Sequence, residues 1–204
     1  MRILFIPAKI KAELNKTKIE ALKLPKNIAI AYSIQYIDIA NKIRNILSKR
    51  YNITQTTQIL GCSKPIFSKN TEAVLLIGSG QFHAVSLAIT TNLPIYILDS
   101  DKLRKVSEEE INDFKKKQQG AYLRFLDSNR VGILVSAKPG QENLKRAINI
   151  RTKLKDKKTY LFISNEIDVK QFENFKIDAW VNTTCPRLDF EGFVFNMDNL
   201  GEIK

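Results

Sequence analysis

Apolar runs of strand length alternate along the chain with segments whose apolar residues recur at helical spacing. Residues 27–32 form a nearly continuous apolar run, which is typical of a buried strand. Four apolar positions then recur three to four residues apart and predict a helix: Ile39, Ile43, Ile46 and Leu47. Further strands are expected at 1–7, 57–60, 73–78 and 94–99, with a helix at about 82–90. Strands that alternate with helices indicate a mostly parallel sheet.

A longer helix and a second set of strands follow. Ser107 and Glu110 form a capping box, because each can bond the backbone amide of the other at a helix start. Gly120 is expected to weaken this helix and marks a point where it would break. The pattern then restarts, with strands expected at 130–136, 159–163, 179–182 and 193–195, a helix from Leu144 and a short helix near 169–175.

The restart predicts two related domains of the α/β class. Residues 28–33 and 131–136 both read as a strand that leads through a polar loop into an amphipathic helix. We therefore expect two tandem domains, each a small, mostly parallel sheet flanked by helices. Their predicted bounds are 26–128 and 129–204, preceded by a strand and linker over residues 1–25.

Composition indicates the cellular compartment of the protein more clearly than its function. The 204 residues carry a formal net charge of +12, mostly from lysine runs such as 115–117. Such runs attract nucleic acid, but without interleaved aromatic residues or a nucleic-acid-binding motif they favour solvated helix faces. Two cysteines do not make a disulfide scaffold, and no apolar run is long enough for a membrane span. We expect a cytoplasmic protein with reduced thiols.

Polar clusters follow several predicted strands, where ligands collect in open parallel sheets. They are Cys62, the segment GSGQFH (78–83), the segment KPGQ (138–141) and the segment CPR (185–187). Each also has a simpler interpretation, since a glycine pair can be a tight turn and a cysteine a small buried apolar residue. Cys62 and Cys185 lack the spacing of a metal motif. From the residues alone we expect a two-domain α/β protein with a shared polar crevice.

Four segments in one order carry a more specific signal. They are QILGC (58–62), LIGSGQFH (76–83), KPGQ (138–141) and VNTTCPRLD (181–189). Together they resemble the 2-(3-amino-3-carboxypropyl)histidine synthase family, the radical enzymes that begin diphthamide biosynthesis. Quinolinate synthase, a similar three-domain iron–sulfur architecture, fits the KPGQ and CPRLD segments less well.

The resemblance implies a fold and a chemistry. Family members have three α/β domains around a crevice, and each domain supplies one cysteine to a 4Fe–4S cluster. The open iron binds S-adenosylmethionine, whose 3-amino-3-carboxypropyl group is transferred to a histidine of translation elongation factor 2. This implies that Cys62 and Cys185 are cluster ligands. It makes Arg187 a carboxylate partner and Gln35 and Gln141 weaker catalytic candidates.

The resemblance also implies a set of residues that bind the cofactor. The backbone amides of residues 78–80 would face the nucleoside or the carboxylate of S-adenosylmethionine. The full expected set is Gly78, Ser79, Gly80, His83, Pro139 and Gly140.

The chain departs from the family in having two cysteines where three are required. Residues 1–25 resemble the end of a first domain that is otherwise missing. A separate chain or homologous subunit would then supply that domain and the third thiolate. Otherwise the chain is a non-catalytic partner of a complete synthase or of elongation factor 2, or a truncated gene product. A basic nucleic-acid-binding α/β protein is the remaining alternative.

Overall fold

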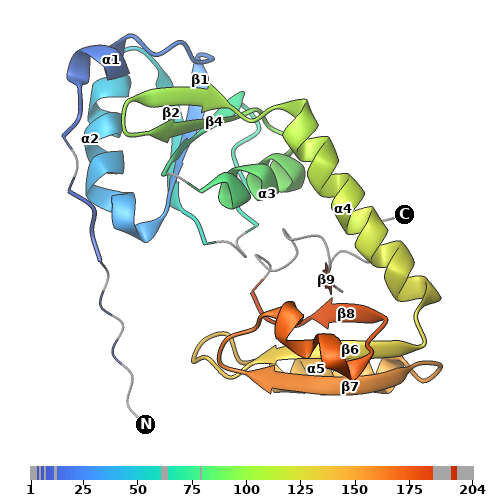
Figure 1. The fold of residues 1–204 in the computed structure, drawn as a ribbon. Helices are drawn as coiled ribbons and strands as arrows, with labels where there is room; N and C mark the ends of the chain where they lie inside the picture. Colours follow the sequence, from blue (N-terminus) through green and yellow to red (C-terminus); the bar gives the residue numbers. More distant parts are fainter. Residues whose placement is uncertain are drawn as a thin grey trace. The chain divides into compact units, whose positions relative to one another are not determined.

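The structure is a computed structural model, and it describes residues 4, 6, 8–11, 13–60, 64–78, 80–185 and 194–196. The chain forms two compact units, Met1–Ile111 and Asn112–Lys204. Each contains a mostly parallel sheet with helices beside it (Figure 1), so the predicted fold class is confirmed. The predicted domain bounds at 25/26 and 128/129 stay predictions.

The first unit has a five-stranded sheet in the order β2-β1-β3-β4-β5, in which only β5 runs antiparallel to its neighbour. Its strands are β1 (Asn27–Tyr32), β2 (Asn52–Gln58), β3 (Ala73–Ile77), β4 (Ile95–Asp99) and β5 (Lys102–Lys105). Its helices are α1 (Lys16–Glu20), the 3-10 helix η1 (Ile34–Tyr36), α2 (Ile37–Leu47) and α3 (Gln81–Thr91).

The core of this unit lies between the sheet and its helices. All five residues of β3 are buried, and α2 buries the predicted positions Ile39, Ile43 and Leu47, while Ile46 packs partly against them. Removing such side chains from water contributes about 2 kcal/mol each. The strand predicted at 57–60 was misplaced, because β2 begins at Asn52 and carries mostly polar, half-buried side chains.

The second unit has a four-stranded sheet in the order β7-β6-β8-β9, with every pairing parallel. Its strands are β6 (Arg130–Ser136), β7 (Lys158–Ser164), β8 (Ala179–Asn182) and β9 (Val194–Asn196). Its helices are α5 (Leu144–Lys153) and the 3-10 helix η2 (Val169–Phe175), and α4 (Glu108–Asp127) leads into it from the first unit.

Helix α4 begins at the predicted capping box and does not break. The Glu110 backbone N–H donates to Ser107 Oγ at 3.1 Å, and the Ser107 N–H donates to the Glu110 carboxylate at 2.8 Å. The helix runs without interruption through Gly120 to Asp127, so the expected break there is wrong. Its buried residues Ala121 and Phe125 pack against the second sheet, and this packing compensates for the low helix propensity of Gly120.

Both units share one framework at the amino ends of their strands. In the first, the Asn27 N–H at the start of β1 donates to Glu72 Oε2 at 2.7 Å. In the second, the Arg130 N–H at the start of β6 donates to Asp178 Oδ2 at 2.7 Å. Each carboxylate immediately precedes the third strand of its unit, so the same contact ties first and third strands together. Within the described ranges, no helix has both the length and the apolar character to cross a membrane.

Candidate functional site

The strand orders put a switch point in each sheet. The first strand of each unit lies between the second strand, on one side, and the third strand, on the other. In the first unit the chain therefore leaves β1 toward one side of the sheet, to β2, and leaves β3 toward the other side, to β4. Ligands of open parallel sheets bind at such points, beyond the carboxyl ends of the strands.

Gly78 marks the switch point of the first unit. Its φ of 149° is one that side-chain-bearing residues rarely adopt. A Cβ on Gly78 would lie 3.6 Å from the Tyr36 ring and 3.8 Å from Ser33 Oγ. Gly78 therefore faces the loop that follows β1 and brings its backbone against Ser33 and Tyr36. Sequence reasoning missed these two residues, because nothing local reveals that β1 and β3 are neighbours.

Helix α3 starts directly beyond this glycine. Gly80 is its N-cap residue and contributes no capping side chain. The start of this helix carries the partial positive charge of the helix dipole, which attracts anions. His83 lies back over this turn, because a Cβ on Gly80 would come within 2.6 Å of His83 Nδ1. The predicted residues Gly78, Gly80 and His83 are thus brought together, while Ser79 lies outside the described residues.

Gln81 of the same motif has a structural contact instead. Its Nε2 donates to Glu110 Oε1 at 2.8 Å, and Arg104 lies 3.0 Å from the same oxygen. Partial burial acts to raise the pKa of Glu110, but the Ser107 N–H and the Arg104 charge outweigh it and keep that pKa below its usual range. Glu110 therefore joins the starts of α3 and α4 as a carboxylate.

Three further predicted residues and Gln35 lie in connections that follow the first strand of each unit, at the carboxyl edges of the two sheets. Gln35 is exposed in η1 after β1, and its carbonyl accepts from the Ile10 N–H at 2.9 Å. In the second unit, Gln141 N–H donates to the Lys138 carbonyl at 3.0 Å and closes a turn after β6. Pro139 and Gly140 occupy the middle of this turn, and Gly140 has a φ of 80°.

Cys185 follows β8 on a loop held by buried polar side chains. Asn182, the last residue of β8, is 1% exposed. Its Oδ1 accepts from both the N–H and the hydroxyl of Thr184 at 2.8 Å, and its Nδ2 donates to the Cys185 carbonyl at 2.9 Å. Cys185 itself is a partly exposed free thiol at the carboxyl edge of the sheet.

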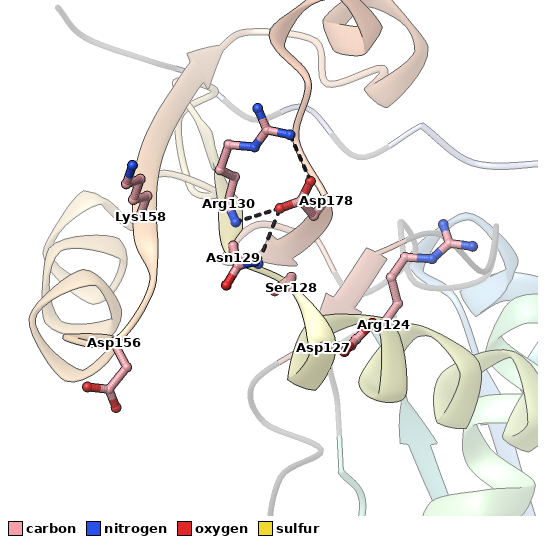
Figure 2. A pocket seen from close by; sticks show the side chains of 8 residues that line it. All are labelled: Arg124, Asp127, Ser128, Asn129, Arg130, Asp156, Lys158 and Asp178. Atoms are coloured by element: carbon pink, nitrogen blue, oxygen red, sulfur yellow. Dashed lines mark hydrogen bonds and ion pairs between the residues drawn. The ribbon is translucent and has the colours of Figure 1, made fainter.

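A polar hollow lies at the opposite, amino edge of the second sheet (Figure 2). It measures about 850 Å³. It is lined by Arg124, Asp127, Ser128, Asn129, Arg130, Asp156, Lys158 and Asp178. Three cations face three carboxylates there, so neither sign of ligand is favoured. Asp178 is engaged with the backbone of Asn129 and Arg130, which makes this edge part of the framework.

Comparison with known proteins identifies the family. The profile of the family described as "Putative diphthamide synthesis protein" matches residues 1–193. The chain belongs to this family. The 2-(3-amino-3-carboxypropyl)histidine synthase of Pyrococcus horikoshii is 26% identical over 186 residues, 85% of this chain and 54% of that protein. Its namesake in Methanocaldococcus jannaschii is 29% identical over 175 residues, 83% of this chain and 47% of that protein.

The fold is also shared with solved structures. The crystal structure of Dph2 from Pyrococcus horikoshii superposes with a TM-score of 0.74 at 24% identity, covering 89% of this chain and 57% of that one. The structure of the same protein with a 4Fe–4S cluster gives a TM-score of 0.73 at 23% identity, over 85% and 55%. The predicted family is confirmed, and the chain spans about half the length of these relatives.

An iron–sulfur cluster is held by cysteine thiolates, and the donor type of Cys185 suits it. Among the residues that the structure describes, no group of three or more His, Cys, Asp or Glu side chains could hold a metal ion. Cys62 and Arg187 lie outside the described residues. That Cys62 and Cys185 bind one cluster in a shared crevice stays a prediction.

Proposed function

We propose that this chain acts in the first step of diphthamide biosynthesis, as a subunit or short form of the iron–sulfur enzyme. The proposed reaction transfers a 3-amino-3-carboxypropyl group from S-adenosylmethionine to a histidine of translation elongation factor 2. The family match over residues 1–193 carries the proposal. A partly exposed cysteine thiol on a hydrogen-bonded loop at a sheet's carboxyl edge supports it.

The chain's own residues would bind and orient the cofactors. Cys62 and Cys185 would be thiolate ligands of a 4Fe–4S cluster. When bound, the cluster would supply the electron that cleaves the sulfonium. The first-turn amides of α3 would hold the carboxylate or ribose of S-adenosylmethionine against Gly78. Arg187 would pair with the amino-acid carboxylate through two parallel hydrogen bonds.

Two cysteines are one fewer than a three-thiolate cluster requires. We expect the third thiolate to come from outside these 204 residues, on a separate chain or a homologous subunit. Three thiolates would leave one iron of the cluster without a protein ligand, and S-adenosylmethionine would bind there. Because the thiolates would come from two chains, the isolated chain should bind less iron than the chain with its partner.

The test is anaerobic reconstitution of the full chain with iron and sulfide, alone and with a co-expressed family member. We expect iron and sulfide to bind only when both cysteines are present. Cys62→Ala and Cys185→Ala should each lose most of the bound iron, whereas Lys116→Ala, a change to an exposed residue of α4, should not. Iron retained by the double cysteine variant, or no iron even with the partner, contradicts the proposal.

The cysteine count favours one alternative, a non-catalytic partner of a complete synthase or of elongation factor 2. In that case the fold and its surfaces suffice, and the thiols are dispensable. Cells that carry the Cys62→Ala/Cys185→Ala chain would then keep normal diphthamide levels and normal partner binding. A loss of diphthamide in those cells, with the variant chain still folded, decides for the enzyme subunit.

A further inference from the structure

Asn182 uses both ends of its side-chain amide within the loop that carries Cys185. The amide oxygen accepts from the N–H and the hydroxyl of Thr184, each at 2.8 Å. The amide nitrogen donates to the Cys185 carbonyl at 2.9 Å. Asparagine carries its acceptor oxygen and its donor nitrogen as two separate atoms, which is what these three contacts use.

The base of this loop is fixed to the neighbouring strand. Thr183 directs both its N–H, at 3.2 Å, and its hydroxyl, at 2.7 Å, to the Leu134 carbonyl of β6. Thr183 is 2% exposed and Asn182 is 1% exposed, so neither contact competes with bulk water. Thr183 therefore anchors the end of β8 to β6, whereas Asn182 contacts the backbone of Cys185, which is itself partly exposed.

We infer that Asn182 is a positioning residue for the Cys185 thiol. Holding the Cys185 carbonyl restricts the backbone torsions of that residue and so sets the direction of its Cα–Cβ bond. Removing a group that holds a metal ligand in this way typically lowers metal affinity about 10- to 100-fold. The inference rests on the proposed function for its purpose, the binding of iron by Cys185.

A purely structural role makes a different prediction. Asn182 would then affect only stability, in proportion to the buried hydrogen bonds lost. A positioning role also changes how Cys185 reacts and what spectrum its bound iron gives. Two variants separate the contacts: Asn182→Ala removes these three, while Asn182→Asp keeps the Thr184 contacts and replaces the donor to the Cys185 carbonyl with an oxygen that repels it. Thr183→Val is the matched control, because it removes a neighbouring buried hydrogen bond that does not touch Cys185.

The first readout uses the metal-free full chain. Iodoacetamide alkylation of Cys185 is followed at one fixed pH by peptide mass spectrometry, with Cys62 of the same molecule as the internal reference. Releasing one hydrogen-bonded carbonyl should raise the relative rate at Cys185 about fivefold in Asn182→Asp and more in Asn182→Ala. Thr183→Val should leave the ratio unchanged. Wild-type ratios in both Asn182 variants overturn the inference.

The second readout is the iron content and electron paramagnetic resonance spectrum after anaerobic reconstitution. Both Asn182 variants should bind less iron and give an altered spectrum, while Thr183→Val matches wild type. Wild-type spectra from all three variants overturn the inference while the proposed function stands. If the wild-type chain binds no iron with any partner, the proposed function fails, and the alkylation ratios still decide whether Asn182 positions Cys185.

Folding of the variants is checked by circular dichroism. If both Asn182 variants fail to fold, Thr184→Ala carries the test, since it removes only the hydroxyl contact to Asn182 Oδ1. An increase in the relative alkylation rate of about twofold is then expected. An unchanged ratio in folded Thr184→Ala would count against the inference.

Discussion

The two units have the same amino edges but different carboxyl edges. At both amino edges an acidic residue before the third strand holds the first N–H of the central strand, Glu72 in one unit and Asp178 in the other. At the carboxyl edges the first unit offers glycine backbone at Gly78 and Gly80. The second unit instead buries polar side chains there, among them Ser136 and Asn182.

This difference suits the two tasks that we propose for the units, cofactor binding in the first and positioning of the Cys185 thiol in the second. A backbone without side chains lets a small molecule approach the amides of a helix start. A network of buried polar side chains holds one protein group in a fixed position. Gly78 and Gly132 have different roles. Gly78, in the first unit, provides a backbone conformation, whereas Gly132, in the second unit, provides space for a ring.

The largest effect is expected from Gly132→Ala. A Cβ on Gly132 would lie 2.4 Å from Cζ3 of Trp180. The ring cannot easily retreat, because Phe162 contacts it edge-on with centroids 4.8 Å apart. Overpacking of this kind should lower the free energy of unfolding by about 3 kcal/mol. Urea denaturation followed by far-ultraviolet circular dichroism measures it, and the same signal serves variants that lack Trp180, the chain's single tryptophan.

A double-mutant cycle tests whether space is the reason. In a Trp180→Leu background the clash is absent, so the cost of Gly132→Ala should fall by more than half. Equal costs in the two backgrounds would mean that Gly132 is required for its backbone, as Gly78 is, and would remove the contrast between the units.

The second effect, about 2 kcal/mol, is expected from Gly78→Ala. Its φ of 149° strains any side-chain-bearing residue. The nearest atoms, on the Tyr36 ring, would be 3.6 Å from the new Cβ, which is an ordinary contact. Tyr36→Ala should therefore not reduce the cost, and thermal unfolding of the single and double variants checks this. Rescue by Tyr36→Ala would show that Gly78, too, serves packing.

The sequence predicted the elements that bury apolar residues, and it failed where a strand is polar. The face of α2 and the strand β6 follow from apolar periodicity. Strand β2 is half-buried and polar, and β5 is a charged strand that forms only by pairing with β4. Neither has the apolar run on which strand prediction depends.

The candidate site was predictable to the same extent. Gly78 and Gly80 were found because a strand, two glycines and a helix follow one another in the sequence. Ser33 and Tyr36 were missed because they meet Gly78 only through the pairing of β1 with β3. Asn182 was missed because its role arises from a loop that folds back on its own side chain.

A smaller effect of opposite sign is expected from Gly120→Ala. Gly120 is exposed in the middle of α4, and a Cβ there would meet nothing within 4 Å. With neither a special φ nor a space requirement, alanine should stabilise the helix by about 0.5–1 kcal/mol. A rise in the thermal midpoint measures the gain. A loss of stability instead would show that glycine has a third role that neither sheet reveals.

The smallest effect concerns the shared amino edge. Asp178 accepts hydrogen bonds from the backbone N–H and from the guanidinium of Arg130. These two bonds, the backbone one more strongly, keep the pKa of this carboxyl below its usual range. A carboxyl group with a lowered pKa stabilises the fold when the pH is above its ordinary, unfolded pKa. This contribution is lost as the pH falls through the lowered pKa of the folded state. Asp178→Asn should therefore be less stable than wild type at pH 7, and the gap in thermal midpoint should shrink below about pH 4.

Asp156→Asn is the control, because it removes a carboxylate from the same hollow without touching these contacts. It should keep the wild-type dependence of the thermal midpoint on pH. A constant gap for Asp178→Asn would mean that the carboxylate's charge is irrelevant and that only its shape holds the first strand to the third.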